Sequence, residues 1–138
     1  MADTNTRQAI LEALITQLES VTFPVGAKIT YWDVFEQDYN GAASITVRDE
    51  EEEMSKSNQF YNNVLGVEVE SVAYTTSANK LADSCAMLEA LKTALLLEDW
   101  LPVPAYVRPL SNTKAIAEGG KIGISVVLNL EIEYRQIA

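Results

Sequence analysis

Histidine is absent from this sequence of 138 residues, and cysteine occurs only once, at Cys85. Most protein zinc sites and most activated nucleophiles are built with these two residue types. The chain therefore lacks the usual zinc ligand sets, an internal disulfide, and a Ser-His or Cys-His dyad. Cys85 lies in helical phase with Leu81 and Leu88. We expect it to be a small buried apolar residue and not a nucleophile.

Positive charge is scarce as well, because 10 Lys and Arg stand against 20 Asp and Glu, giving a net charge of −10. Such an excess opposes the phosphate contacts that supply most nucleic-acid affinity, so we do not expect a protein that grips DNA. No apolar run approaches the roughly 18 residues of a membrane helix. The acidic, polar N-terminus is unlike a signal peptide. We expect a soluble protein, with no membrane partner, made in a reducing cytoplasm.

The length and composition predict one folded domain over residues 1–138. A chain of this size buries roughly two-thirds of the surface that its unfolded form exposes. Its hydrophobic content of 48% and charged content of 22% lie in the globular range. We found no internal repeat.

The first half of the chain predicts a helix followed by strands. From Thr6 onward, apolar residues recur at helical spacing, and the segment 22–27, with a proline and a glycine, ends that helix. The segment 28–35 is rich in β-branched and aromatic residues, and turn residues separate it from 43–47. We expect these two segments to form a hairpin.

The middle of the chain predicts a long flexible loop, a strand and a second helix. Residues 48–63 show no sustained alternation, which is typical of a loop. Strand character returns over 64–75, with a change of phase that predicts a bulge near Glu70 and Ser71. The hydroxyl residues 75–77 precede an apolar helical face that ends near Trp100, before two prolines.

The last third contains the clearest signal. A short edge strand over 105–110 and a mobile connection over 111–120 precede residues 121–135, where apolar residues alternate without a break. Fully extended, that last strand spans about 45 Å, long enough for part of it to reach beyond its own subunit. The pattern predicts an α+β fold: a mainly antiparallel sheet of four or five strands, mixed pairing allowed, with two amphipathic helices on one face.

Five consecutive carboxylates form the most conspicuous motif. They are Asp49, Glu50, Glu51, Glu52 and Glu53. Neighbouring side chains in an extended segment point in different directions, and the spacing and turn glycine of a calcium loop are missing. A glycosidase pair needs two rigidly held carboxyls, which a flexible loop does not provide. The readings that remain are a solvated acidic loop and an electrostatic surface for a partner.

Two strand segments, "VEVE" at 67–70 and "LEIE" at 130–133, alternate apolar residues with glutamate. If the apolar residues face the helices, the opposite face of the sheet carries the glutamates Glu68, Glu70, Glu131 and Glu133. That face is either a solvated surface relieved by Arg135 or the lining of a space through which a polyanion must move without adhering.

Six segments stand in order along nearly the whole chain. They are "RQAILEALITQLE", "ITVRDEEEE" before the long loop, "VEVESVAYT", "ADSCAMLEALKTALL", "VRPLSNTKAI" and the closing "GISVVLNLEIEYR". This arrangement resembles the tail terminator proteins of long-tailed bacteriophages, the family that includes the minor tail protein U of lambda-like phages. The resemblance implies a virion subunit at the junction of tail and neck, made in the cytoplasm of the bacterial host.

The resemblance further implies that subunits close into a hexameric ring on the last ring of the tail tube. The ring stops tube polymerisation and presents a joining surface to the head-tail connector protein, while DNA passes through without tight binding. It implies no enzyme activity and no cofactor. The nine carboxylates named above are the candidates for channel lining or partner binding, and segments 48–63 and 111–120 are candidates for contacts that become ordered on assembly.

Two alternatives stay open. Other phage neck proteins and head or tail completion proteins share this size and texture. A small acidic enzyme that uses carboxylates with Mg²⁺ belongs to a different class, and substrate phosphate would have to complete its metal site.

Overall fold

The structure is a computed structural model that describes residues 6–20, 27–31, 43–76, 78–119 and 121–137. These residues form two helices and five strands. The elements in chain order are α1 (Thr6–Glu19), β1 (Ala27–Tyr31), β2 (Ala43–Ser57), β3 (Phe60–Thr75), α2 (Lys80–Leu95), β4 (Ala105–Gly119) and β5 (Lys121–Ile137). The predicted α+β class is confirmed.

The strands form one twisted sheet in the order β1-β2-β3-β5-β4. The pairs β2·β3, β3·β5 and β4·β5 are antiparallel, and β1 runs parallel to β2. The predicted hairpin between segments 28–35 and 43–47 is therefore wrong. A direct turn can join only antiparallel neighbours, and a parallel pair requires a crossover. Residues 32–35 of the first segment lie outside the described residues.

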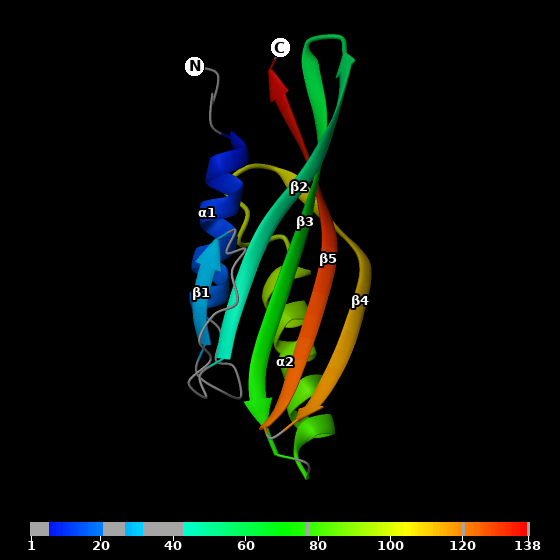
Figure 1. Cartoon of the computed structure of the whole chain (residues 1–138). Helices are drawn as coiled ribbons and strands as arrows, with labels where there is room; N and C mark the ends of the chain where they lie inside the picture. The colour runs from blue at the N-terminus through cyan, green and yellow to red at the C-terminus, as the bar shows by residue number, and fades with distance from the viewer. Residues whose placement is uncertain (1–5, 21–26, 32–42, 77, 120, 138) are drawn as a thin grey trace.

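Both helices lie on one face of the sheet (Figure 1). In α1 the fully buried residues Ile10, Leu14 and Leu18 recur at helical spacing. In α2 the buried stripe runs through Met87, Leu91 and Leu95. The side-chain amide of Gln17 donates to the backbone carbonyl of Ala94 at 3.0 Å and joins the two helices. The sequence predicted both helices, although α2 ends at Leu95, short of Trp100.

The phase predicted for α2 was partly wrong. Cys85 is exposed and Leu81 is 66% exposed, while Ser84 is completely buried in the position expected for Cys85. The Nζ atom of Lys114 on β4 lies 3.2 Å from the sulfur of Cys85. The buried stripe of α2 is thus rotated by about one residue from the one we predicted.

The central strands β3 and β5 supply 10 of the 21 buried apolar core residues in the described part of the chain. Along β5 the side chains of Ile124, Val126, Leu128, Leu130 and Ile132 are buried, and they alternate with side chains on the far face. The two strands pair without interruption from Phe60↔Ile137 to Thr75↔Ile122. The expected alternation is confirmed, and β5 finds partners along nearly its whole length within its own chain.

The bulge predicted near Glu70 and Ser71 is absent from β3, where the register with β5 is continuous. Ser71 and Ala73 continue the buried face, while Val72 and Tyr74 point to the other side. The apparent change of phase arises because small residues take the core positions under α2. Register shifts occur in other strands, at Asp49/Glu52 of β2 and at Pro109/Ser111 of β4.

Both predicted loops are strands. Most of segment 48–63 belongs to β2 and β3, which meet at a two-residue turn, Asn58 and Gln59. Asn58 has a φ of 53°, a left-handed conformation that asparagine tolerates better than most residues. Segment 111–119 continues β4. The edge strand predicted over 105–110 is the first part of β4, and residues 111–116 were missed because they are all exposed and show no alternation of apolar and polar residues.

Candidate functional site

The five carboxylates lie in β2 and not in a loop, and a bulge divides them. Asp49 pairs with Val67 and Glu52 pairs with Leu65, so one extra residue of β2 is inserted between these two pairs. Asp49 and Glu52 consequently both face the helices, although they are three residues apart. Glu50, Glu51 and Glu53 are exposed. Two of the five carboxylates therefore point toward the helices, and the other three are exposed.

Asp49 forms an ion pair with Arg7 of α1. The Nε atom of Arg7 donates to Oδ2 of Asp49 at 2.9 Å, and its Nη2 atom donates to the same oxygen and to the Glu50 carbonyl at 3.0 Å. Asp49 is 8% exposed. Because a buried carboxylate is costly without a partner, this contact ties the first turn of α1 to the bulge of β2.

Glu52 accepts a hydrogen bond from the hydroxyl of Tyr134 on β5 at 2.7 Å. Burial raises the pKa of Tyr134, and the hydrogen bond to Glu52 raises it further. The phenol therefore stays protonated and acts as a donor. Beside it, the amide of Asn63 donates to Gln136 at 3.0 Å, and the Asn63 Oδ1 atom has no hydrogen-bond partner among the described residues.

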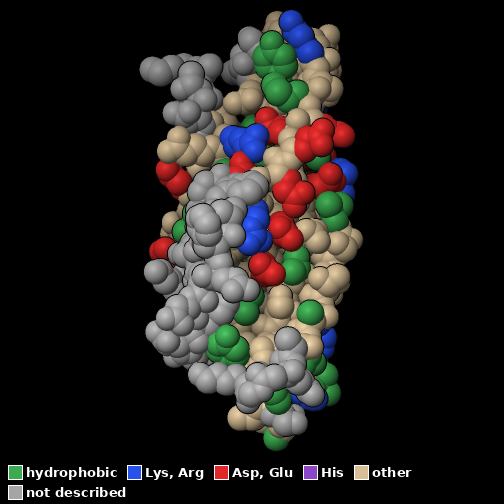
Figure 2. Space-filling model, in the orientation of Figure 1, with side chains coloured by type: hydrophobic (Ala, Val, Ile, Leu, Met, Phe, Trp, Pro, Cys, Tyr) green, Lys and Arg blue, Asp and Glu red, His purple; other side chains and the backbone are tan. Residues whose placement is uncertain are grey.

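The other face of the sheet carries the four strand glutamates. Side chains of Asp and Glu gather on this face where β3 and β5 run (Figures 1 and 2). Glu68 pairs with Asn129, Glu70 with Val127, Glu131 with Gly66 and Glu133 with Val64. No glutamate of one strand stands directly opposite a glutamate of the other, so the register avoids the closest like-charge contacts.

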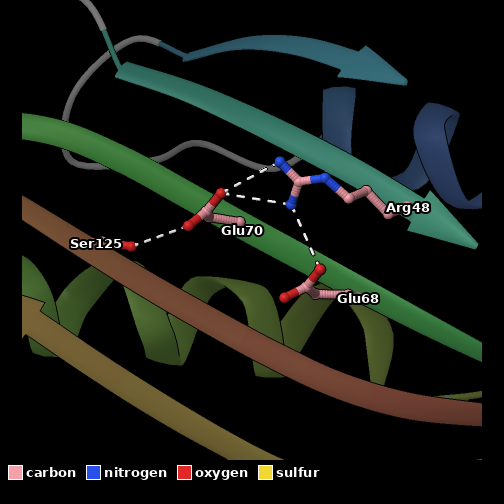
Figure 3. Close-up of polar contacts among 4 residues, drawn as sticks. All are labelled: Arg48, Glu68, Glu70 and Ser125. Atoms are coloured by element: carbon pink, nitrogen blue, oxygen red, sulfur yellow. Dashed lines mark hydrogen bonds and ion pairs between the residues drawn. The ribbon is translucent and has the colours of Figure 1, made fainter. Parts of the chain in front are cut away.

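Two arginines from the flanking strands bind these glutamates in pairs. Arg48 of β2 contacts Glu68 and Glu70, both at 3.4 Å (Figure 3). Arg108 of β4 contacts Glu131 at 3.3 Å and Glu133 at 3.0 Å. Four carboxylates and two guanidinium groups leave an excess of two negative charges. We name these six side chains the acidic face.

The ion pairs of the acidic face contribute little to folding stability. Glu68 and Glu70 are about one-third exposed, and Arg108 is 59% exposed. Pairs in contact with water typically contribute less than about 1 kcal/mol each. The hydroxyl of Ser125 also donates to Glu70, at 3.3 Å (Figure 3). These contacts fix where the charges stand more than they stabilise the sheet.

Sequence reasoning placed the four glutamates on the correct face but missed their partners. It offered Arg135 as the balancing charge, and Arg135 lies instead over the ring of Phe60, 5.8 Å from the ring centre. Arg48 and Arg108 were the residues to find. Each of these arginines lies in a strand next to a strand that carries two of the glutamates. The sequence could have identified the arginines as partners only if the strand order had been known.

Among the described residues, no three acidic or cysteine side chains lie close enough together to hold a metal ion. A hollow of about 450 Å³ lies at one edge of the sheet, where β4 starts beside Tyr134 and leaves the end of β5 without a β4 partner. Its lining consists of Pro104, Ala105, Tyr106, Glu133, Tyr134 and Arg135. In the part of the chain that the structure describes, no helix is long and apolar enough to cross a membrane.

A scan against models of known protein families found no match to this chain. A search of curated proteins found no match either.

Proposed function

We propose that this protein is a structural virion subunit that closes as a hexameric ring on the end of a phage tail tube. The ring stops polymerisation of the tube protein and offers a joining surface to the head-tail connector, and the genome passes through it. The proposed role requires no catalysis and no cofactor. It rests on the resemblance of the ordered sequence segments and on the charge of the acidic face.

The acidic face is the observation that carries the proposal. The two helices cover the opposite side of the sheet, so the four glutamates face away from the core on rigid central strands. In water, each excess carboxylate repels a phosphate about 10 Å away by about 0.4 kcal/mol before salt screening. A ring repeats this patch in every subunit. A wall of that kind lets a polyanion slide past without adsorbing.

The rigidity of the acidic face also supports a lining role over a docking role for a basic partner. Arg48 and Arg108 hold each pair of glutamates from outside, so a partner's lysine or arginine would compete with an arginine already in place. A small but persistent negative charge suits repulsion at a distance, because repulsion needs no direct contact.

Electron microscopy of negatively stained tail tubes mixed with the protein tests the proposal. We expect tubes of fixed length that carry an extra ring at one end, and no ring on tubes to which bovine albumin is added instead. Tubes that continue to grow without an end ring would refute the capping role. Binding to isolated head connectors without binding to tubes would assign the protein to head completion.

The lining role has its own test. A variant with Glu68→Gln, Glu70→Gln, Glu131→Gln and Glu133→Gln should still cap tubes but should lower the yield of infectious particles when it replaces the wild-type protein. A matched control carries Glu12→Gln, Glu19→Gln, Glu89→Gln and Glu98→Gln on the helices and beyond α2. Equal yields for the two variants would count against a lining role.

A further inference from the structure

The hairpin formed by β2 and β3 extends past the first turn of α1 and forms an arm (Figure 1). We define the arm as residues 53–63 together with residues 135–137 of β5, which pair with Phe60 to Asn62. All eight residues from Glu53 to Phe60 are exposed. The arm is therefore a narrow ribbon of strands with little apolar burial of its own, which makes it a poor stabiliser of the isolated subunit.

The tip of the arm combines apolar and cationic side chains. Met54 is 59% exposed and Phe60 is 40% exposed. Lys56 lies over the ring of Tyr61 at 6.0 Å, and Arg135 lies over the ring of Phe60 on the other face of the ribbon, because Phe60 and Tyr61 are neighbours in β3. Among the described residues, neither cation has a carboxylate partner. In a chain with a net charge of −10, an unpaired basic tip stands out from the rest of the surface.

The base of the arm has the opposite charge. Glu50, Glu51 and Glu53 are exposed, and within the described part of the chain their carboxylates have no partner. Strand geometry separates Lys56 from these glutamates, while Arg135 leaves the same face of the ribbon as Glu53. Glu53 pairs with Val64 and Lys56 with Tyr61, so their side chains leave opposite faces of the ribbon. Glu50 and Glu51 stand about 15 to 20 Å from Lys56 along the strand.

We propose that the arm is a self-association surface in which the basic tip of one copy docks against the acidic base of the next copy. A second copy supplies carboxylates to Lys56 and Arg135, which have no carboxylate partner among the described residues of their own chain. It also covers Met54 and Phe60. Tip and base are different patches, so the contact is head-to-tail, the type that generates rings when the rotation between copies closes.

The arrangement of charge favours a second copy over a nucleic acid as the occupant. A phosphate chain drawn to the tip would run beside three unpaired glutamates a few residues away, and these would repel it. The same glutamates would repel an anionic lipid surface. Another copy of this chain offers an acidic base to the basic tip, and its own basic tip can bind an acidic base in turn.

Charge reversal tests the contact. The tip-reversed variant carries Lys56→Glu and Arg135→Glu, and the base-reversed variant carries Glu50→Lys, Glu51→Lys and Glu53→Lys. A control carries Lys80→Glu and Lys92→Glu on α2, with the same change in net charge as the tip-reversed variant. Sedimentation velocity and light scattering over a range of protein concentrations, at low and at high salt, report the mass of each protein. Circular dichroism and Tm confirm that each variant is folded.

We expect the wild-type protein and the control to self-associate at low salt and to dissociate as salt is added. Each reversed variant alone should associate at least about tenfold more weakly, a loss of about 1.4 kcal/mol. An equimolar mixture of the two reversed variants should associate again, because the acidic tip of one then matches the basic base of the other. This recovery is the outcome that a merely damaged fold does not produce.

Three results of the association measurements would overturn the inference. They are a wild-type protein that stays monomeric at every concentration at low salt, a tip-reversed variant that associates as the wild type does, and a mixture that fails to associate. Wild-type monomers that bind a single-stranded oligonucleotide or anionic vesicles, with binding lost on tip reversal, would assign the tip to that ligand and also overturn it.

The inference rests on the proposed function only in naming a ring as the product of head-to-tail contact. The two are separable by experiment, since self-association is measured without tail tubes. Copies that associate through the arm but leave tubes uncapped would refute the proposed function alone. Tubes capped equally well by the wild-type and tip-reversed proteins would refute the role of the arm alone.

Discussion

The hydroxyl of Tyr134 donates to the carboxylate of Glu52 across the buried face of the sheet, at 2.7 Å. The two residues come from β5 and β2, which are separated by β3 in the strand order. The bond exists because the bulge of β2 turns Glu52 toward the helices. It joins the start of the arm to the core of the domain.

Replacing Tyr134 with phenylalanine should lower the free energy of unfolding by about 1 kcal/mol at neutral pH, because one hydrogen bond is lost and the ring is kept. Urea denaturation followed by circular dichroism measures the change. Tyr106→Phe is the matched control, since Tyr106 is 68% exposed and we expect no effect there. Equal stability of the Tyr134→Phe variant and the wild type would show that water replaces the phenol at no cost.

The same substitution should change how stability depends on alkaline pH. The pKa of Tyr134 is raised in the folded state, so its contribution is complete below the unfolded value of about 10 and declines as pH rises beyond it. From about pH 9 to about pH 11 the wild type should therefore lose more stability than the Tyr134→Phe variant. Denaturation midpoints of both proteins, measured across this pH range, test the prediction. If the midpoints of the two proteins change with pH by the same amount, the raised pKa of Tyr134 is contradicted.

Breaking the contact between Arg7 and Asp49 should cost more than losing the phenol. Arg7→Ala leaves a carboxylate that is 8% exposed without its guanidinium, and we expect a loss of about 2 kcal/mol. A double-mutant cycle with Asp49→Asn isolates the pair, with an expected coupling of about 1 kcal/mol or more. Arg7 is 40% exposed, which keeps the expectation below that for a fully buried pair. If the effects of the two single substitutions on the free energy of unfolding are additive, the coupling free energy between Arg7 and Asp49 is zero and the prediction is wrong.

The turn of the arm depends on the backbone of Asn58. Its φ of 53° is strained for a β-branched residue, so Asn58→Val should cost about 1 to 2 kcal/mol, and Asn58→Gly should be neutral or slightly stabilising. Gln59→Val is the control, because Gln59 does not have a positive φ. Thermal unfolding measures all three variants. A Val variant as stable as the control would mean that the turn relaxes freely.

Reversing the acidic face should create affinity for DNA. A variant with Glu68→Lys, Glu70→Lys, Glu131→Lys and Glu133→Lys places six cationic groups together on one face, counting Arg48 and Arg108. We expect this variant to be retained on a double-stranded DNA column at low salt and released as salt rises, while the wild type flows through. Retention of the wild-type protein would contradict a repulsive role for this face.

The sequence predicted those parts of the fold in which one side of an element is buried. Strand β5 carries an apolar residue at each buried position, and the helices do so at every buried position except Thr6 and Ser84, so the sequence pattern identified these elements. The arm and the second part of β4 have no such pattern, since residues 53–60 and 111–116 are exposed on both faces. Hydrogen bonding to neighbouring strands makes them regular, and a local pattern of side chains does not record that pairing.

The sequence predicted the candidate site in part as well. Alternation alone placed Glu68 and Glu131 on the face away from the helices. It did not identify Arg48 and Arg108, because their positions follow from strand order and register. Nor did it separate Asp49 and Glu52 from their neighbours, since a bulge is a property of a pair of strands and not of one segment.

The register shift at Pro109 and Ser111 hinders the addition of a further strand at the β4 edge of the sheet. β4 is an edge strand of 15 residues, long enough to template another strand of any extended polypeptide. Proline has no amide hydrogen, and the shift interrupts the spacing of donors and acceptors near the middle of that edge. An additional strand could pair with only two short stretches of β4, and these two stretches are out of register with each other. The protein can thus expose a long strand at high concentration and still resist uncontrolled fibre growth.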